Sequence, residues 1–277
     1  MAVNEDVDVV KGFGQQWSLY DQSVLNQEEL QQNSERYFEI FPWSKLPANA
    51  TGFDLGCGSG RYSRYVAQRV GHLHCIDASG AALLVAKKNL KDLPNCSFHH
   101  ASVDQMPIDD NSMDFGCSLG VFHYVPYPQS GIRDCVKKLK PGAPFLMYVY
   151  YALDNRPWWF RAIWRVSDLC RRIISCLPFI VKEPVCKSIA IFVYFPLARL
   201  ALLLEKLGAN VHNFPLATYR NLSFYTMSTD ALDRFGTKLE HRFTREQVTQ
   251  MMSNAGLERI IFSEKVFWAA CGFKKNL

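Results

Sequence analysis

The amino-acid sequence predicts an α/β protein, in which helices cover both faces of a mostly parallel β-sheet. Short apolar runs alternate with segments of helical periodicity from Thr51 onward, and this alternation is typical of β-α-β units. A glycine-rich turn, Asp54 to Gly60, joins the first apolar run to the first helical segment. The 277 residues are 48% hydrophobic and 21% charged, which indicates a globular chain with a large core.

Seven strands and their connecting helices can be assigned in chain order. The apolar runs predict strands at residues 51–55, 72–76, 95–100, 113–119 and 143–151. Helices are expected between them, near residues 60–70, 79–91 and 128–140. A later helix, near residues 244–255, begins with a capping box in which Thr244 is the N-cap and Gln247 the N3 residue. Two β-rich runs, 257–262 and 266–273, complete the sheet.

The glycine-rich turn predicts a cofactor site. Gly56, Gly58 and Gly60 alternate after an acidic residue, so the backbone can form a floor that a flat cofactor approaches without meeting a Cβ atom. The dinucleotide pattern G-x-G-x-x-G requires glycine where this chain has Arg61, and the P-loop pattern is absent. Asp77 closes the second apolar run 23 residues after Asp54, a position suited to accepting hydrogen bonds from ribose hydroxyls.

Four motifs together resemble one family. The D-x-G-x-G-x-G turn and Asp77 are followed by Met106–Phe115, which is similar to "LPFPDNSFD", and by Lys138–Ala143, which is similar to "LKPGG". In this order and spacing they resemble the class I S-adenosylmethionine-dependent methyltransferases, most closely over residues 51–151. The resemblance implies a Rossmann-like seven-stranded sheet whose last two strands form an antiparallel hairpin.

The family also implies which residues hold S-adenosylmethionine and release S-adenosylhomocysteine. By resemblance, the methionine portion, the ribose and the adenine are bordered by Asp54, Gly56, Gly58, Gly60, Asp77, Ala78, Ser102, Val103, Leu119 and Gly120. One position departs from the family, because Ala101-Ser102 stands where Gly-Asp is frequent. The Ser102 hydroxyl can still accept a hydrogen bond, but it is neutral and its side chain reaches less far than that of aspartate. Asp104, two positions further on, is an alternative acceptor.

Three residues are candidates for catalysis. His123 lies in the segment Leu119–Tyr124, which resembles "EVLHHV", and an imidazole suits the removal of a hydroxyl proton near neutral pH. Tyr20, together with Trp17, belongs to a segment resembling the "FG-x-x-W" lid of small-molecule members of the family. His241 belongs to a stretch, 233–243, that resembles the family's entry into its last helix. Packing roles remain open alternatives for His123 and His241, as well as for Trp17 and Tyr20.

About ninety residues between the fifth strand and Thr244 predict an inserted helical cap. Residues 157–177 form an amphipathic helix, with Trp159, Ile163 and Val166 among its apolar residues and arginines in a separate stripe. The segment 189–204 is too short for a membrane span and contains Pro196 and Arg199, which favours a buried or interfacial helix kinked near Pro196.

The charge of the chain is concentrated in this insert. Residues 156–215 carry nine Lys or Arg and three acids, a net charge of +6, whereas the whole chain has +5. A basic amphipathic segment with Trp, Phe and Leu opposite the charges can rest on an anionic membrane surface. A solvated positive face is the alternative. Because the insert lacks a nucleic-acid-binding motif or basic tail, nucleic acid is not an expected partner.

Other classes of protein are disfavoured by composition. The nine scattered cysteines include no Cys-x-x-Cys pair, so we expect free thiols in a reducing cytosol and no metal site. The acidic segment Met1–Asp8 lacks the apolar core of a secretory signal. These features predict a cytoplasmic protein, and peripheral contact with a membrane is one of the two interpretations of its basic insert.

The expected function is methyl transfer from S-adenosylmethionine to a hydrophobic small-molecule or lipid-like acceptor. O-methylation is favoured because a histidine and several tyrosines fall in the expected pocket segments. The expected parts are residues 1–50 as a helical lid, 51–151 as the cofactor-binding core, 152–243 as the substrate cap and 244–277 as the completion of the sheet. The alternatives are a non-catalytic cofactor-binding subunit, an RNA or DNA methyltransferase, and an NAD-dependent oxidoreductase, which Arg61 disfavours.

Overall fold

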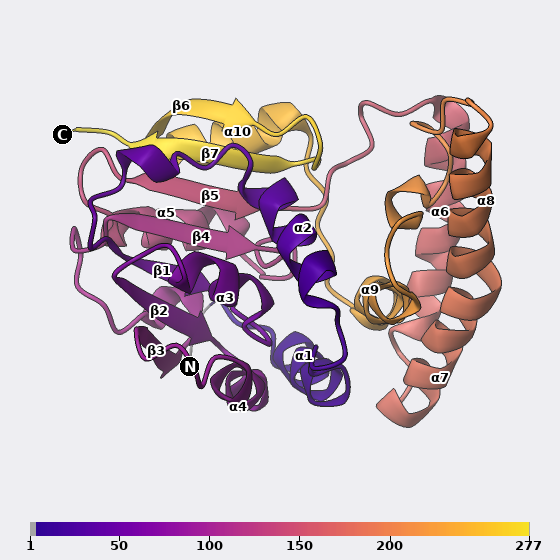
Figure 1. Ribbon diagram of the computed structural model, residues 1–277, viewed down its shortest axis with the longest axis horizontal. Coiled ribbons are helices and arrows are strands. Elements are labelled where there is room, and N and C mark those ends of the chain that lie inside the picture. Colours follow the sequence, from indigo (N-terminus) through magenta and orange to yellow (C-terminus); the bar gives the residue numbers. More distant parts are fainter. Residues whose placement is uncertain (1–3, 277) are drawn as a thin grey trace. The chain divides into compact units, whose positions relative to one another are not determined.

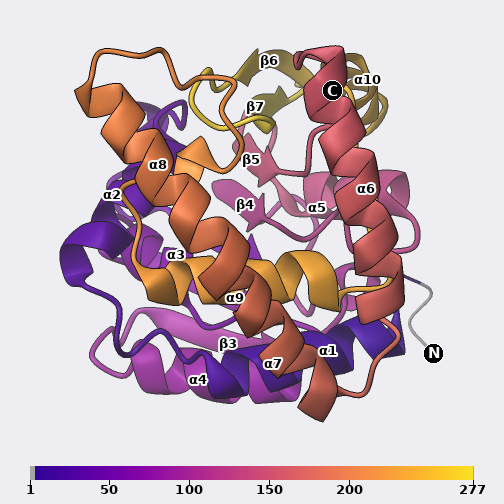
Figure 2. The same cartoon turned by 90° about the vertical axis from the view of Figure 1, so that its right-hand side faces the viewer.

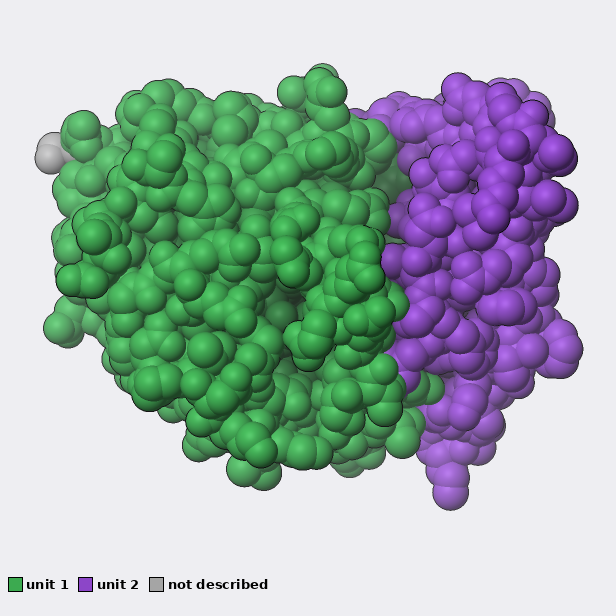
Figure 3. Space-filling view, in the orientation of Figure 1, with its two compact units in different colours: residues 1–152, 239–277 green, residues 153–238 purple. Residues whose placement is uncertain are grey.

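The structure is a computed structural model that describes residues 4–276 (Figure 1). Residues 1–3, at the start of the predicted lid and of the acidic N-terminal segment, lie outside the described residues, as does residue 277. The chain forms two compact units (Figure 3). Unit 1 consists of Met1–Ala152 and Leu239–Leu277, and unit 2 consists of Leu153–Lys238.

Unit 1 is built on a single seven-stranded sheet with the order β3-β2-β1-β4-β5-β7-β6. The first five strands run parallel to their neighbours, whereas β7 is antiparallel to both β5 and β6. The strands are β1 (Thr51–Leu55), β2 (His72–Asp77), β3 (Cys96–His100), β4 (Phe115–Leu119), β5 (Pro144–Tyr148), β6 (Leu257–Phe262) and β7 (Ala269–Lys274). The prediction of a Rossmann-like, mostly parallel α/β sheet is confirmed.

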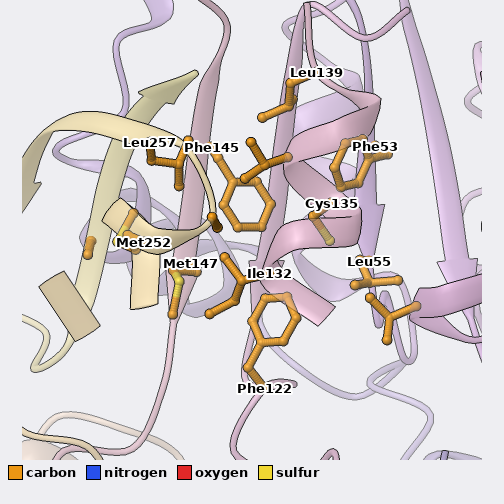
Figure 4. Close-up of a cluster of buried hydrophobic side chains, with 14 of the residues drawn as sticks. Phe53, Leu55, Phe122, Ile132, Cys135, Leu139, Phe145, Met147, Met252 and Leu257 are labelled. Carbon is orange, nitrogen blue, oxygen red and sulfur yellow. The ribbon is translucent and has the colours of Figure 1, made fainter. Parts of the chain in front are cut away.

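Helices cover both faces of this sheet. On one face, α5 and α10 bury Ile132 and Met252 against Phe53 and Phe145 of the strands (Figure 4). On the other face, α2, α3 and α4 pack over a second cluster that includes Leu73 of β2. The helices of unit 1 are α1 (Val7–Leu19), α2 (Gln27–Phe38), α3 (Arg61–Ala67), α4 (Gly80–Asn89), α5 (Pro128–Lys138) and α10 (Arg245–Asn254), with 3₁₀ turns at Trp43–Lys45 and Val103–Gln105.

Local sequence explains two of these details. The capping box at the start of α10 forms as predicted, because the Thr244 side chain accepts a hydrogen bond from the Gln247 N–H and the Gln247 side chain accepts one from the Thr244 N–H. In the central strands, a Cβ on Gly116 would lie 2.4 Å from the Phe53 ring, and one on Gly52 would lie 2.3 Å from the Phe115 ring. Each glycine therefore makes room for a core aromatic ring on the neighbouring strand.

Unit 2 is helical and is organised around one central helix. It contains α6 (Trp158–Ile174), α7 (Phe179–Ile189), a π-helical turn (Ala190–Tyr194), α8 (Phe195–Lys206), a 3₁₀ turn (Ala217–Tyr219) and α9 (Phe224–Gly236). α6, α7 and the π-helical turn all pack against α9. Figures 1 and 2 show α6 and the α7–α8 helix on the same side of α9.

Two basic side chains of unit 2 satisfy the carbonyl groups at the end of α9. Arg171 Nη1 donates to the Thr237 and Lys238 carbonyl oxygens, both at 2.9 Å. Lys182 Nζ donates to the Gly236 carbonyl oxygen at 2.9 Å. The last carbonyls of a helix lack intrahelical donors and carry partial negative charge, so cations are favourable there. The α6 side chain of Arg171 is consequently turned inward.

The expected helix at residues 189–204 is part of a longer one, and the length argument against a membrane span was wrong. The backbone stays helical from Phe179 to Lys206, a run of 28 residues, because the π-helical turn joins α7 directly to α8 and Pro196 lies in the first turn of α8. By length and composition this helix could cross a membrane.

Candidate functional site

The glycine-rich turn lies at the carboxyl end of β1, where it leads into α3. Gly56, Gly58 and Gly60 have φ angles of 70°, 54° and 78°, in the left-handed region that glycine adopts without strain. The N–H groups of Gly56 and Cys57 both donate to the Ile76 carbonyl, at 2.7 and 3.1 Å, and so fix the turn to the end of β2. The carboxyl edge of parallel strands is the usual ligand-binding edge of such sheets.

Two of these glycines are also required by close neighbours. A Cβ on Gly56 would lie 2.2 Å from Cγ2 of Val121, in the segment that follows β4. A Cβ on Gly58 would lie 2.9 Å from the indole Nε1 of Trp17, which belongs to α1. The turn is therefore held between the end of β4 and the N-terminal helix.

Asp77 connects the glycine turn to the end of β2. Its carboxylate accepts hydrogen bonds from the Gly58 N–H and from the Ser79 N–H, both at 2.8 Å. Burial raises the pKa of Asp77, and the two N–H donors counteract part of that effect. A carboxylate offers about four lone-pair positions, so Asp77 keeps capacity for the two hydroxyls of a ribose while it supports the loop.

Asp54 is a second buried carboxyl group beside the turn. Only 3% of the residue is exposed, and its Oδ2 accepts a hydrogen bond from the Ser63 hydroxyl at 2.6 Å. Burial raises the pKa of Asp54 from 3.8 to about 6, against the effects of Ser63 and Cys117. Asp54 thus joins β1 to α3 and takes up a proton more readily than a carboxyl group in water.

The raised pKa of Asp54 predicts a pH-dependent stability. The folded state retains its proton up to about pH 6 and the unfolded state only to about pH 3.8, so the stabilisation is complete below pH 3.8 and is lost as pH rises through 6. Between pH 4 and 7 the free energy of unfolding of the native chain should fall by about 2 kcal/mol relative to Asp54→Asn. Urea unfolding of both chains across this range tests the prediction, and parallel pH profiles would contradict it.

The residues expected around adenine lie at the ends of β2 and β3. The Ala101 N–H donates to the Asp77 carbonyl at 3.1 Å, which joins the two strand ends. The Ser102 hydroxyl donates to the Asp104 carboxylate at 2.7 Å, and Val103 begins the following 3₁₀ turn. The polar group at the end of β3 is therefore a hydroxyl–carboxylate pair, although this chain has Ser102 where the family frequently has aspartate. Next to it, a His100 ring nitrogen bonds the Ala78 carbonyl at 2.8 Å.

Helix α1 lies along the carboxyl edge of the sheet and packs against α4 (Figure 1). Asn4 exchanges two hydrogen bonds with the backbone of Tyr127, the Phe13 ring lies 5.0 Å from that of Tyr124, and Trp17 lies against Gly58. At the end of α1, Tyr20 is buried, and its N–H donates to the Gln16 carbonyl. The lid and catalytic roles of Tyr20 stay predictions.

A cluster of aromatic and histidine side chains lies at the ends of β4 and β5. The His123 ring stacks on Tyr150 with centroids 3.9 Å apart and lies 4.1 Å from the ring of Tyr124. The Tyr124 and Tyr150 hydroxyls are 3.1 Å apart. The His241 N–H donates to the His123 carbonyl at 2.8 Å, so the structure brings together both histidines named from the sequence. Gly120, with φ 83°, donates its N–H to the Tyr148 carbonyl and completes the turn after Leu119.

His123 is fully buried, and its hydrogen bonds define its protonation. Burial, followed by the positive charge of Arg242 and by His241, holds the pKa of His123 well below 6.5. Nδ1 accepts a hydrogen bond from the Tyr150 N–H at 3.4 Å, so the neutral ring carries its proton on Nε2. This Nε2 atom is buried and has no hydrogen-bond partner in the described structure. The geometry makes Nε2–H a donor, whereas the sequence led us to expect a base.

A buried ion pair next to this cluster was missed by sequence reasoning. Arg242 Nε lies 2.7 Å from Glu240 Oε1, and only 2% of the Glu240 side chain is exposed. The Arg242 guanidinium lies 4.9 Å from the centroid of the Tyr150 ring and also donates to the Tyr151 carbonyl. The two residues flank His241 in the segment that precedes α10, and this spacing of opposite charges was the available signal.

The polar groups around the turn fit a polar cofactor. The Ser59 hydroxyl and the Gln16 side-chain Nε2 are buried without a hydrogen-bond partner in the described structure, and they belong to the turn and to α1. Buried polar atoms in native proteins are nearly always satisfied, so two such atoms indicate a ligand or water. Among residues 4–276 no cluster of three or more His, Cys, Asp or Glu side chains is arranged to hold a metal ion.

Comparison with known proteins identifies the domain. Residues 53–147 match the family model for the methyltransferase domain. Residues 53–147 form a methyltransferase domain. S-adenosylmethionine is the cofactor of such a domain, and the matched residues include the glycine turn, Asp77 and the end of β4. Over almost its full length, the chain is also similar to a solved Haloferax volcanii structure, a complex of the Trm112 methyltransferase activator with a methyltransferase, which shares the fold. That match has a TM-score of 0.57, 14% identity and coverage of 97% of this chain and 98% of that one.

Curated relatives match the methyltransferase domain over part of their length. The chain is 32% identical over 99 residues to the ubiquinone biosynthesis O-methyltransferase of Marinobacter nauticus, a segment that is 34% of this chain and 42% of that one. It is 26% identical over 149 residues to the ubiquinone/menaquinone biosynthesis C-methyltransferase UbiE of Brucella canis, covering 48% and 54%. The chain thus spans about half the length of these relatives or less.

Proposed function

We propose that this protein transfers a methyl group from S-adenosylmethionine to a hydrophobic small-molecule or lipid-like acceptor, with oxygen as the favoured methylated atom. The observation that supports the proposal is the Asp77 carboxylate, which holds the glycine turn through the Gly58 N–H and keeps lone pairs that could accept hydrogen bonds from a ribose. The relatives named as quinone O- and C-methyltransferases support an aromatic or isoprenoid-like acceptor. Because those names include both O-methylation and C-methylation, the preference for oxygen rests on the residues of this site alone.

The aromatic cluster is the proposed acceptor end of the site. The bound cofactor supplies a methyl group already activated for displacement, so the residues around it act mainly by positioning and by excluding water. The rings of Tyr124 and Tyr150 provide apolar walls with hydroxyls at their edge, and His123 Nε2–H provides one buried donor to orient an acceptor oxygen. This role replaces the general base that the sequence suggested for His123.

The proton that the acceptor hydroxyl loses requires a different group. The Nε2 atom of His241 is buried without a hydrogen-bond partner in the described structure, and His241 is tied to His123 through its backbone. We assign His241 as the base that accepts this proton while the new oxygen–carbon bond forms. His241→Gln should then lower the rate of methyl transfer with little change in cofactor affinity.

The proposal is tested with S-adenosylmethionine labelled with ¹³C in its methyl group. The full chain, incubated with a lipid extract, should transfer label into the organic phase, and NMR of the product should show a methyl carbon bonded to oxygen. A chain inactivated by heat is the control. Binding of S-adenosylhomocysteine without any labelled acceptor would favour the non-catalytic alternative, and label in added RNA or DNA would overturn the choice of acceptor.

The substrate-cap role of residues 152–243 and a cytoplasmic, membrane-peripheral location belong to the same proposal. A hydrophobic acceptor is concentrated in membranes, which supports a protein that works at their surface. The basic character of the insert supports it as well.

A further inference from the structure

Unit 2 exposes an unusual number of large apolar side chains. Of the 21 exposed large apolar residues in the part of the chain that the structure describes, 15 lie between Trp158 and Leu207. They are Trp158, Trp159, Ile163, Val166, Leu169, Ile173, Ile180, Val181, Ile191, Phe192, Val193, Phe195, Leu200, Leu203 and Leu207. Soluble monomers rarely expose contiguous apolar patches of this kind, and such patches mark interaction surfaces.

Helix α6 packs inside unit 2 through the face that carries Asp168 and Arg171, which leaves its apolar face exposed. Asp168 and Arg171 are each 6% exposed and form an ion pair at 2.7 Å, while Arg171 also satisfies the end of α9. Trp158, by contrast, is 74% exposed. The face of α6 that carries this ion pair therefore packs on protein, and its apolar side has no protein partner in the described structure.

The α7–α8 helix adds a second apolar face on the same side of α9 (Figure 2). Ile180 is 83% exposed and Phe192 is 76% exposed. Between Lys187 and Glu205 the only charged residue is Arg199, which is turned inward and donates to the Arg220 and Leu222 carbonyls. The exposed side of the helix is thus free of charge over about 25 Å at 1.5 Å per residue.

The exposed charges that border the apolar face of α6 are basic. Arg161, Arg165 and Arg172 are exposed and recur at helical spacing, so they form one row beside the apolar face of α6. Trp158 and Trp159 stand at the start of the same helix. Basic residues together with tryptophans at the border of an apolar face are complementary to anionic headgroups above acyl chains.

We propose that the apolar faces of α6 and α7–α8 embed in the surface of an anionic lipid bilayer, with both helices lying in the membrane plane. Crossing the bilayer would require the α7–α8 helix to leave α9 and would break the bonds that Arg199 and Lys182 make inside unit 2. Lying in the plane keeps these bonds and buries only the exposed face. The proposal does not depend on the reaction, so its test requires no methyl transfer.

Binding of the full chain to phosphatidylcholine vesicles, with and without phosphatidylglycerol, tests the proposal. The native chain should sediment with both and bind the anionic vesicles at least about tenfold more tightly. Ile180→Gln/Phe192→Gln should weaken binding to both kinds of vesicle by at least about tenfold, since each side chain loses its burial in the acyl region. Both positions are exposed, so the variant should fold normally.

A pair of charge variants distinguishes the effect of the basic row on vesicle binding from the effect of the chain's net charge. The affinity of Arg161→Gln/Arg165→Gln for anionic vesicles should fall by about tenfold or more, whereas its affinity for neutral vesicles should stay unchanged. Lys91→Gln/Lys275→Gln removes the same charge at exposed positions of unit 1 and should bind as the native chain does. Arg171 is unsuitable for this purpose because it is buried.

Three results would overturn the proposal. If neither Ile180→Gln/Phe192→Gln nor Arg161→Gln/Arg165→Gln changes vesicle binding, the membrane contact lies elsewhere in the chain. Resistance of the bound chain to alkaline carbonate extraction would indicate a helix that crosses the bilayer. A dimer that forms without lipid and is lost in Ile180→Gln/Phe192→Gln would assign the surface to a second copy of the chain.

Discussion

Asp77→Ala is expected to weaken binding of S-adenosylhomocysteine at least about hundredfold. The substitution removes the proposed ribose acceptor and also frees the N–H groups of Gly58 and Ser79, which the carboxylate holds at 2.8 Å. A hydrogen bond to a charged group contributes about 1.5–3 kcal/mol, so the loss of even one cofactor contact together with loop support reaches this magnitude. Isothermal titration calorimetry of the full chain measures the effect directly.

Two variants make this prediction specific. Asp77→Asn keeps one carbonyl oxygen for the loop and should lose affinity to an intermediate degree, because its NH₂ group cannot accept a hydrogen bond. Asp109→Ala removes an exposed carboxylate of the same unit and should bind as the native chain does. Equal affinity in the native chain and in Asp77→Ala would contradict the assignment of the ribose site.

Arg171→Ala is expected to destabilise unit 2 by about 3 kcal/mol. Arg171 pairs with Asp168 and satisfies two carbonyls at the end of α9, and removing one member of a buried ion pair typically costs about 3–5 kcal/mol. The pKa of Asp168 reflects the same network, since burial would raise it but Arg171 and Arg172 hold it below its usual value. Limited proteolysis with mapped cleavage sites should show cleavage within residues 153–238 accelerating about a hundredfold.

Arg172→Ala is the matched control on the same helix. Arg172 also pairs with Asp168, at 3.0 Å, but its side chain is 71% exposed, so its loss should cost less than about 1 kcal/mol. Similar cleavage rates in the two variants would show that the buried network does not hold α6 to α9. Cleavage in unit 1 should be unchanged in both.

The strand pattern and the cofactor turn were predictable because local sequence determines them. The parallel strands are short apolar runs, and the turn needs glycine at φ angles that other residues avoid. The box at Thr244 and Gln247 was equally local, because both partners lie within one helical turn. In each of these cases the physical requirement falls on neighbouring residues.

The environment of His123 and the orientation of α6 could not be read from the sequence. The pKa of His123 depends on Arg242 and His241, which lie more than a hundred positions away along the chain. Periodicity gave an amphipathic helix at α6 but not which face packs on protein, and that choice depends on the distant end of α9. The length of the α7–α8 helix was missed because the π-helical turn that joins its halves has no sequence signal.

Calorimetric titration of the native chain with S-adenosylmethionine and with S-adenosylhomocysteine tests the central claim most directly. We expect saturable one-to-one binding of both compounds and no response to NADH. Absence of heat with either compound at high concentration, together with binding of NADH, would contradict the account.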